Sequence, residues 1–92
     1  MDLGYPDAEE RTAKVALTVA ILRILEKRGL KQAAAAKLMG VSQPKVSALI
    51  HCRLSGFSVE RLMGFLTALG SDVDITIRPR RSSRTPGRIQ VR

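Results

Sequence analysis

The segment from Lys31 to Arg53 constrains the fold more than any other part of the chain. It opens with an alanine-rich run that favours a short helix over Lys31–Met39. Gly40 follows, and glycine readily adopts the left-handed backbone that a sharp turn between helices needs. With Ser42 as N-cap and a proline close behind it, a further short helix is predicted from Gln43 to about His51. The chain must therefore accommodate two short helices joined by a tight turn.

Two longer apolar patterns flank this segment. The first predicts a helix over about Ala8–Arg28, with Asp7 as its N-cap and Gly29 as its end. The second predicts a helix over Val59–Leu69, which Ser58 caps. The residues expected to face the core are Leu17, Ile21, Ile24 and Leu25 in the first helix, Leu38 in the second, Val46, Leu49 and Ile50 in the third, and Leu62, Phe65, Leu66 and Leu69 in the fourth.

The residues after the last helix alternate between apolar and polar side chains. Val73–Arg78 is therefore predicted to be a strand, with Val73, Ile75 and Ile77 on one face. A lone strand leaves backbone N–H and C=O groups unpaired and is a template for another chain, so we expect this strand to form a homodimer. The alternatives are a solvated extended tail or pairing with Ile89–Val91.

These patterns together predict one domain of the all-α class, with four or five helices and one C-terminal strand. Residues 1–7 are expected to be a flexible arm, residues 8–70 the helical domain, residues 71–79 the dimerisation strand, and residues 80–92 a basic, disordered tail. A chain of 92 residues agrees with a single domain.

The distribution of charge indicates a polyanionic partner. The formal net charge is +8, and no acidic residue lies between Glu26 and Glu60 or after Asp74. Aromatic residues make up only 3% of the chain, which argues against the stacking platforms that bind single-stranded nucleic acids. The excess of positive charge therefore lies in the two short helices and the tail.

Several classes of function are not expected from this sequence. The single cysteine, Cys52, excludes an internal disulfide and a Cys-rich zinc site, and we expect it to be a small structural residue. His51 and Cys52 are adjacent and therefore point in different directions on a helix, so neither a metal site nor a catalytic site is expected, and no cofactor. The apolar run Val15–Leu25 is too short to span a bilayer, and the N-terminus lacks a signal-peptide pattern. We therefore expect a cytoplasmic protein that is not an enzyme and does not bind membranes.

The polar side chains of the two short helices are suited to double-stranded DNA. In a pair of helices of this kind the second helix inserts its first residues among base edges and the first helix lies against the phosphates. The residues expected to read bases are Gln43, Pro44, Lys45, Ser47 and Ala48. The residues expected to contact phosphates are Lys31, Gln32, Ser42 and Arg53. The alternative is an ordinary helical hairpin whose polar face is merely solvated.

The run Gln32-Ala-Ala-Ala-Ala-Lys-Leu-Met-Gly-Val-Ser-Gln-Pro-Lys-Val-Ser-Ala-Leu resembles the helix-turn-helix of the phage repressor/Cro (XRE) family. The resemblance covers about residues 15–70, because Phe57–Gly70 is similar to the closing helix of that family. It implies phosphate contact at the position of Gln32 and base contact on the outer face of the following helix. Pro44 departs from the family pattern, since many members have a polar base reader there.

The ending Asp72-Val-Asp-Ile-Thr-Ile-Arg-Pro79 is similar to that of small HigA-like antitoxins, in which strands pair across a dimer. This resemblance implies a homodimer that binds a palindromic operator, represses its own operon and neutralises a small toxin protein. Two alternatives stay open, namely a stand-alone regulator of the same fold and a basic protein that binds RNA or ribosomes through its tail.

Overall fold

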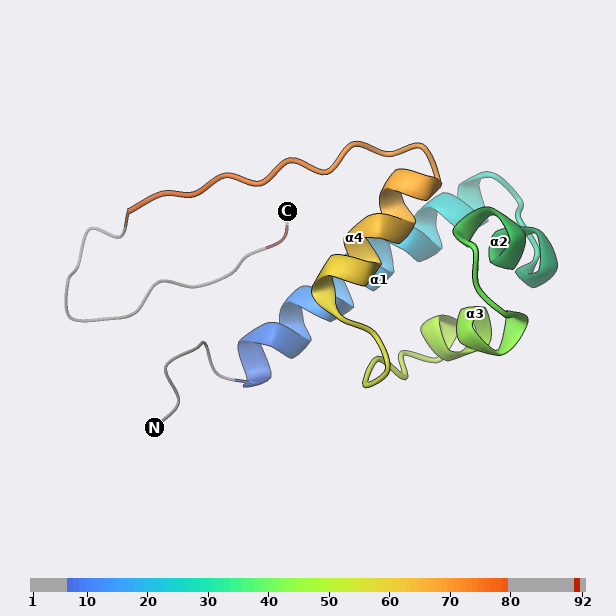
Figure 1. Cartoon of the computed structure of the whole chain (residues 1–92), viewed down its shortest axis with the longest axis horizontal. Helices are drawn as coiled ribbons and strands as arrows, with labels where there is room; N and C mark the ends of the chain where they lie inside the picture. The colour runs from blue at the N-terminus through green and yellow to red at the C-terminus, as the bar shows by residue number, and fades with distance from the viewer. Residues whose placement is uncertain (1–6, 80–90, 92) are drawn as a thin grey trace.

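The computed structural model describes residues 7–79 and residue 91, and within this part the chain forms four α-helices (Figure 1). These are α1 (Asp7–Lys27), α2 (Gln32–Met39), α3 (Gln43–Ile50) and α4 (Val59–Ala68). α4 packs along α1, and α2 lies against α3 and α4. The all-α class is confirmed, and each helix boundary lies within one residue of its predicted position. Asp7 is the first residue of α1 and not its N-cap.

The core joins all four helices of the described region. Five side chains in it have no exposed surface, and they come from every helix: Ile21, Ala35, Val46, Leu49 and Leu62. The predicted core residues of α1 and α4 are buried, apart from Ile24, which is half-buried. Thr18 of α1 is also fully buried, and its hydroxyl donates a hydrogen bond to the Lys14 carbonyl at 2.8 Å. Burial of that hydroxyl therefore leaves no unsatisfied donor.

Two of the predicted core residues were placed on the wrong face. Leu38 of α2 is 44% exposed, because α2 turns Ala35, Ala36 and Met39 toward the core in its place. Ile50 of α3 is 40% exposed, because Leu49 already fills the core position at that end of the helix. In α2 the buried Met39 is the direct neighbour of the predicted Leu38, and in α3 the prediction of Leu49 is confirmed while that of its neighbour Ile50 is wrong.

The α3–α4 connection contributes to the core, which the sequence did not indicate. Leu54 and Phe57 in this connection are both only 3% exposed. The Phe57 N–H donates to the Leu54 carbonyl at 3.0 Å, and the Phe57 ring meets the Phe65 ring edge-on, with 5.9 Å between centroids. The connection is therefore a packed turn whose shape is fixed by two buried side chains.

The described helices end in a left-handed residue. In each case the following N–H donates back to a carbonyl five residues earlier, which caps the helix. Glycine occupies this position after α1, α2 and α4, and Cys52 occupies it after α3 with a φ of 55°. Cys52 is exposed, so its side chain does not pack into the core. Its structural contribution comes from its backbone.

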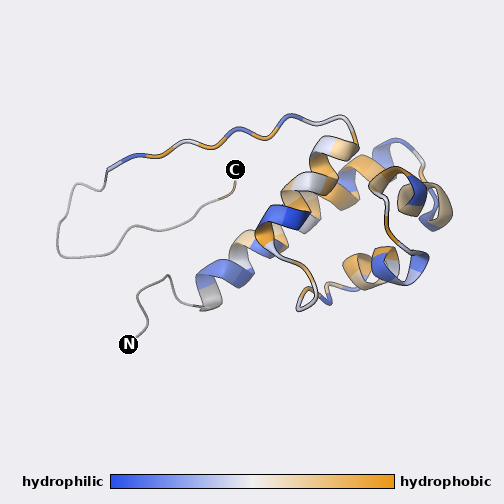
Figure 2. Ribbon diagram, viewed as in Figure 1, coloured by the Kyte–Doolittle hydropathy of each residue, from blue (hydrophilic) through white to orange (hydrophobic). Residues whose placement is uncertain are grey.

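The predicted strand is absent from the described residues. Residues 71–79 run as an extended segment along which polar and apolar residues alternate (Figure 2). Val73 is half-buried against the core, whereas Ile75 is 71% and Ile77 91% exposed. A strand requires ladder hydrogen bonds to a second strand, and the described chain supplies no such partner. The alternative pairing with Ile89–Val91 lies mostly outside the described residues, although Val91 is half-buried against the core.

The predicted arm and basic tail lie outside the described residues, apart from Asp7 and Val91. No helix within the described part of the chain is long and apolar enough to cross a membrane.

Candidate DNA-binding surface

Burial of one face of α3 determines which of its side chains point away from the core. Val46 and Leu49 are completely buried, so the opposite side of the helix is turned away from the core. The residues predicted to read bases on this side are Gln43, Pro44 and Lys45, which are exposed, and Ser47 and Ala48, which are half-buried. Residues four apart lie on the same helix face. Ser47 is therefore a neighbour of Gln43 on the helix surface, and Ala48 is a neighbour of Pro44. These residues form one surface, which we call the α3 outer face.

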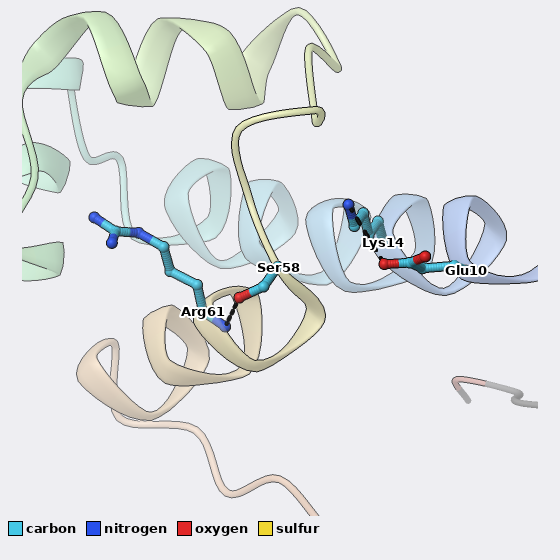
Figure 3. Close-up of polar contacts among 4 residues, drawn as sticks. All are labelled: Glu10, Lys14, Ser58 and Arg61. Carbon is cyan, nitrogen blue, oxygen red and sulfur yellow. Dashed lines mark hydrogen bonds and ion pairs between the residues drawn. The ribbon is translucent and has the colours of Figure 1, made fainter. Parts of the chain in front are cut away.

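The first turns of α2 and α3 carry no side-chain cap. Lys31 and Ser42 occupy the N-cap positions with extended backbones, and neither side chain accepts a cap hydrogen bond. Ser58 at the start of α4 differs, because its hydroxyl accepts the Arg61 N–H at 3.0 Å (Figure 3). Helix N-termini attract anions through free N–H groups and the helix dipole. In α3 such groups are few, because Pro44 has no N–H and the Lys45 N–H donates to the Ser42 carbonyl at 3.1 Å. The uncapped N–H groups that could meet an external acceptor therefore lie mainly at the start of α2.

The charge around these helix starts is positive. The chain has no acidic residue between Glu26 and Glu60, and the Lys and Arg residues of that stretch are exposed: Lys27, Arg28, Lys31, Lys37, Lys45 and Arg53. The ion pair between Lys14 and Glu10, at 3.8 Å, lies on α1 before this stretch (Figure 3). Arg28 has a structural contact, since its Nη1 donates to the Leu69 carbonyl at 3.1 Å. The remaining cations are available to phosphates.

The phosphate-contacting residues predicted from the sequence lie at the ends of the two short helices. Lys31 and Gln32 stand at the start of α2 and Ser42 at the start of α3, and all three are exposed. Arg53 follows α3, and its backbone N–H is used to close the helix, donating to the Ala48 carbonyl at 2.8 Å. Its side chain is exposed.

Two features of this surface were not indicated by the sequence. The Lys45 Nζ lies over the Phe57 ring, 5.1 Å from its centroid, so the lysine leans toward the α3–α4 connection. His51 places its Nδ1 2.8 Å from the Ser47 carbonyl oxygen at the end of α3. Within the described residues, no cluster of three or more His, Cys, Asp or Glu side chains could hold a metal ion.

The arrangement of α2, the Gly40 turn and α3 defines a helix-turn-helix domain. The sequence profile of the helix-turn-helix domain family matches residues 1–78. A solved structure named, provisionally, as an XRE family transcriptional regulator is 52% identical to the chain, with a TM-score of 0.86. That match covers 94% of this chain and 97% of the other. No curated protein matches the chain.

The chain therefore belongs to the XRE family of helix-turn-helix transcriptional regulators. A helix-turn-helix domain implies DNA binding, and membership in this family of regulators confirms that the protein is not an enzyme.

The two N-cap serines allow stability to be separated from binding. We expect Ser58→Ala to lower the free energy of unfolding by about 1 kcal/mol, because it removes a cap hydrogen bond. Ser42→Ala should leave the free energy of unfolding nearly unchanged and should weaken DNA binding, because the Ser42 hydroxyl makes no cap bond. Urea unfolding and a DNA titration of both variants measure the two effects. A large stability loss in Ser42→Ala with unchanged DNA binding would contradict a phosphate-contacting role for Ser42.

Proposed function

We propose that this protein is a sequence-specific repressor that inserts α3 into the major groove of an operator. The observation that carries the proposal is the orientation of α3, whose inner face is held by the fully buried Val46 and Leu49. Its outer face is left exposed within a stretch of chain that has no acidic residue. This combination is expected of a surface that approaches a polyanion.

The side chains of the α3 outer face can discriminate between base pairs. The Gln43 amide can pair with the N6 and N7 atoms of adenine, and the Ser47 hydroxyl can donate or accept. Pro44 and Ala48 present carbon atoms that suit a thymine methyl group. Lys31, Gln32, Ser42 and Arg53 contact the flanking phosphates in this proposal, which fixes the register of the protein on the duplex.

A mobility-shift assay with the upstream DNA of the protein's own gene tests the proposal. We expect a complex at physiological salt that resists a scrambled duplex. Gln43→Ala should cost about 1–3 kcal/mol of discrimination between the two duplexes, because it removes a base contact. Gln32→Ala is the matched control, because loss of a phosphate contact should weaken binding to both duplexes equally.

The opposite pattern would support a different class of function. If Gln43→Ala and Lys45→Ala leave binding intact and removal of residues 80–92 abolishes it, the tail is the binding element. The protein would then be a basic RNA- or ribosome-associated protein.

We further propose that residues 72–78 pair with the same segment of a second copy. Ile75 and Ile77 are exposed although they are large and apolar, and burial of such side chains favours association. A two-fold dimer would also present two copies of α3 to a palindromic operator.

The sequence of the segment favours one register of antiparallel pairing. If the two-fold axis passes at Ile75, Val73 lies opposite Ile77 and Asp72 lies opposite Arg78 of the other copy. An axis at Asp74 would set two carboxylates against each other, which is destabilising. An axis at Thr76 would set Val73 opposite Pro79, which cannot donate to a ladder. The axis at Ile75 is therefore the proposed one.

Disulfide cross-linking tests both the dimer and its register. In a Cys52→Ser background, we expect Ile75→Cys to form a covalent dimer on oxidation, because directly opposed Cβ atoms lie about 4.5–5.5 Å apart. Thr76→Cys is the control and should stay monomeric on a non-reducing gel. If Thr76→Cys formed the covalent dimer and Ile75→Cys did not, the two-fold axis would lie at Thr76 and not at Ile75. A monomeric mass for the unmodified protein would reject the dimer.

A finer proposal is that the repressor is the antitoxin of a toxin–antitoxin module and binds a small toxin protein. An exposed apolar surface on α1 favours it: Val19 is 39% exposed, and Leu22 lines a groove with Leu30, Ala35 and Ile50. The alternative is a stand-alone regulator of the same family.

Co-expression with the neighbouring small open reading frame decides between these two. An antitoxin should co-purify with the product of that frame and rescue cells from its toxicity. Val19→Glu should reduce both effects and leave DNA binding intact, because α1 lies outside the α3 outer face. Absence of complex and of rescue would leave the stand-alone regulator.

A further inference from the structure

Lys45 does not stand out from α3 in the way that a freely extended base reader would. Its Nζ lies 5.1 Å from the centroid of the Phe57 ring. A Cβ atom added to Gly56 would lie 3.4 Å from the same Nζ. Both contacts belong to the α3–α4 connection, so the ammonium group rests against that connection.

Phe57 is a fixed platform for this cation. The side chain is 3% exposed, its ring meets Phe65 edge-on at an interplanar angle of 76°, and its N–H closes the turn to Leu54. A ring held in this way cannot rotate freely, and its face attracts a cation through the aromatic quadrupole. Lys45 is therefore held by a rigid neighbour.

Carboxylates do not compete for the Lys45 ammonium. No acidic residue stands between Glu26 and Glu60 in the sequence, and within the described residues Lys45 makes no ion pair. Lys45 is exposed, so the ammonium keeps open coordination toward solvent. A cation that is held in place and not neutralised is suited to an external anion.

We propose that Lys45 is a phosphate contact positioned by Phe57, and that base discrimination falls to the other residues of the α3 outer face. The inference rests on the proposed insertion of α3 into the major groove. A lysine that reads guanine has to extend its stem toward the base edges, whereas the stem of Lys45 is used to reach the α3–α4 connection. An ammonium is also a point charge that suits a phosphate oxygen.

This assignment makes Phe57 a positioning residue, although it belongs to the core and does not itself touch DNA. Without the ring, Lys45 would sample many rotamers, and ordering the side chain on binding would cost conformational entropy. The contact is independent of sequence, because phosphates carry no base information.

The first test needs no DNA and uses the side-chain resonances of Lys45. In the free protein we expect the ε-CH₂ protons of Lys45 to be shifted upfield by the Phe57 ring. Phe57→Leu should abolish the shift, and Leu25→Val is the control core variant that leaves the Phe57–Phe65 pair in place and should retain it. Thermal unfolding by circular dichroism checks that both variants are folded. An unshifted Lys45 resonance in the unmodified protein would overturn the proposed positioning.

The second test compares salt dependence and sequence preference on the operator and a scrambled duplex. Lys45→Gln, which alters only an exposed side chain, should weaken binding to both duplexes by the same factor. The slope of log K against log salt should fall by about one unit, because one phosphate contact is lost. Phe57→Leu should weaken binding about two- to five-fold, and should have no effect in the Lys45→Gln background.

Loss of preference at a single base pair in Lys45→Gln, with binding to the scrambled duplex unchanged, would show that Lys45 reads a base.

The proposed repressor function and the proposed phosphate contact of Lys45 fail in different ways. If the unmodified protein does not prefer the operator, the repressor function fails, while the salt slope on the scrambled duplex still tests the phosphate contact.

Discussion

The close approach of α2 to its neighbours is the constraint on which the rest of the domain depends. Ala35 and Ala36 bring almost no side-chain volume to the core, yet both are buried, so the backbone of α2 lies near the helices that it contacts. Larger residues at these positions would need space that the close-packed core does not have. The left-handed residue Gly40 then redirects the chain, and burial of Val46 and Leu49 fixes the rotation of α3. Presentation of the α3 outer face follows from these three features.

Local signals in the sequence were sufficient for the helix boundaries, because glycines and N-cap serines act on their immediate neighbours. They were insufficient for the faces of the short helices. A helix of eight residues has about two turns, so Leu38 and Met39, or Leu49 and Ile50, fit the apolar pattern almost equally well. The choice between them depends on how the helix packs against the rest of the fold. Ile21 and Leu62 were easier to place, because the longer α1 and α4 repeat their pattern over more turns.

The candidate site shows the same division between local and non-local information. The positions of Gln43, Ser47 and Ala48 on one helix face follow from helical periodicity alone. The contact between Lys45 and Phe57 joins two elements and depends on how the α3–α4 connection folds, which no short pattern encodes. Ser42 and Ser58 have the same residue type at equivalent helix starts, but only Ser58 makes the cap hydrogen bond. Residues 73–78 showed strand periodicity, but a ladder also requires a partner strand.

The acid-free stretch from Lys27 to Val59 has a consequence for the free protein as well as for binding. Cations that no carboxylate balances repel one another, so they lower the stability of the folded domain at low ionic strength. Salt screens this repulsion and also weakens the attraction to phosphates. The folded domain should therefore become more stable as salt is added, while its complex with DNA becomes weaker. The phosphates of a bound duplex reduce the repulsion between these cations, as dissolved anions do in the free protein. DNA binding therefore stabilises the fold most at low ionic strength, where the free domain is least stable.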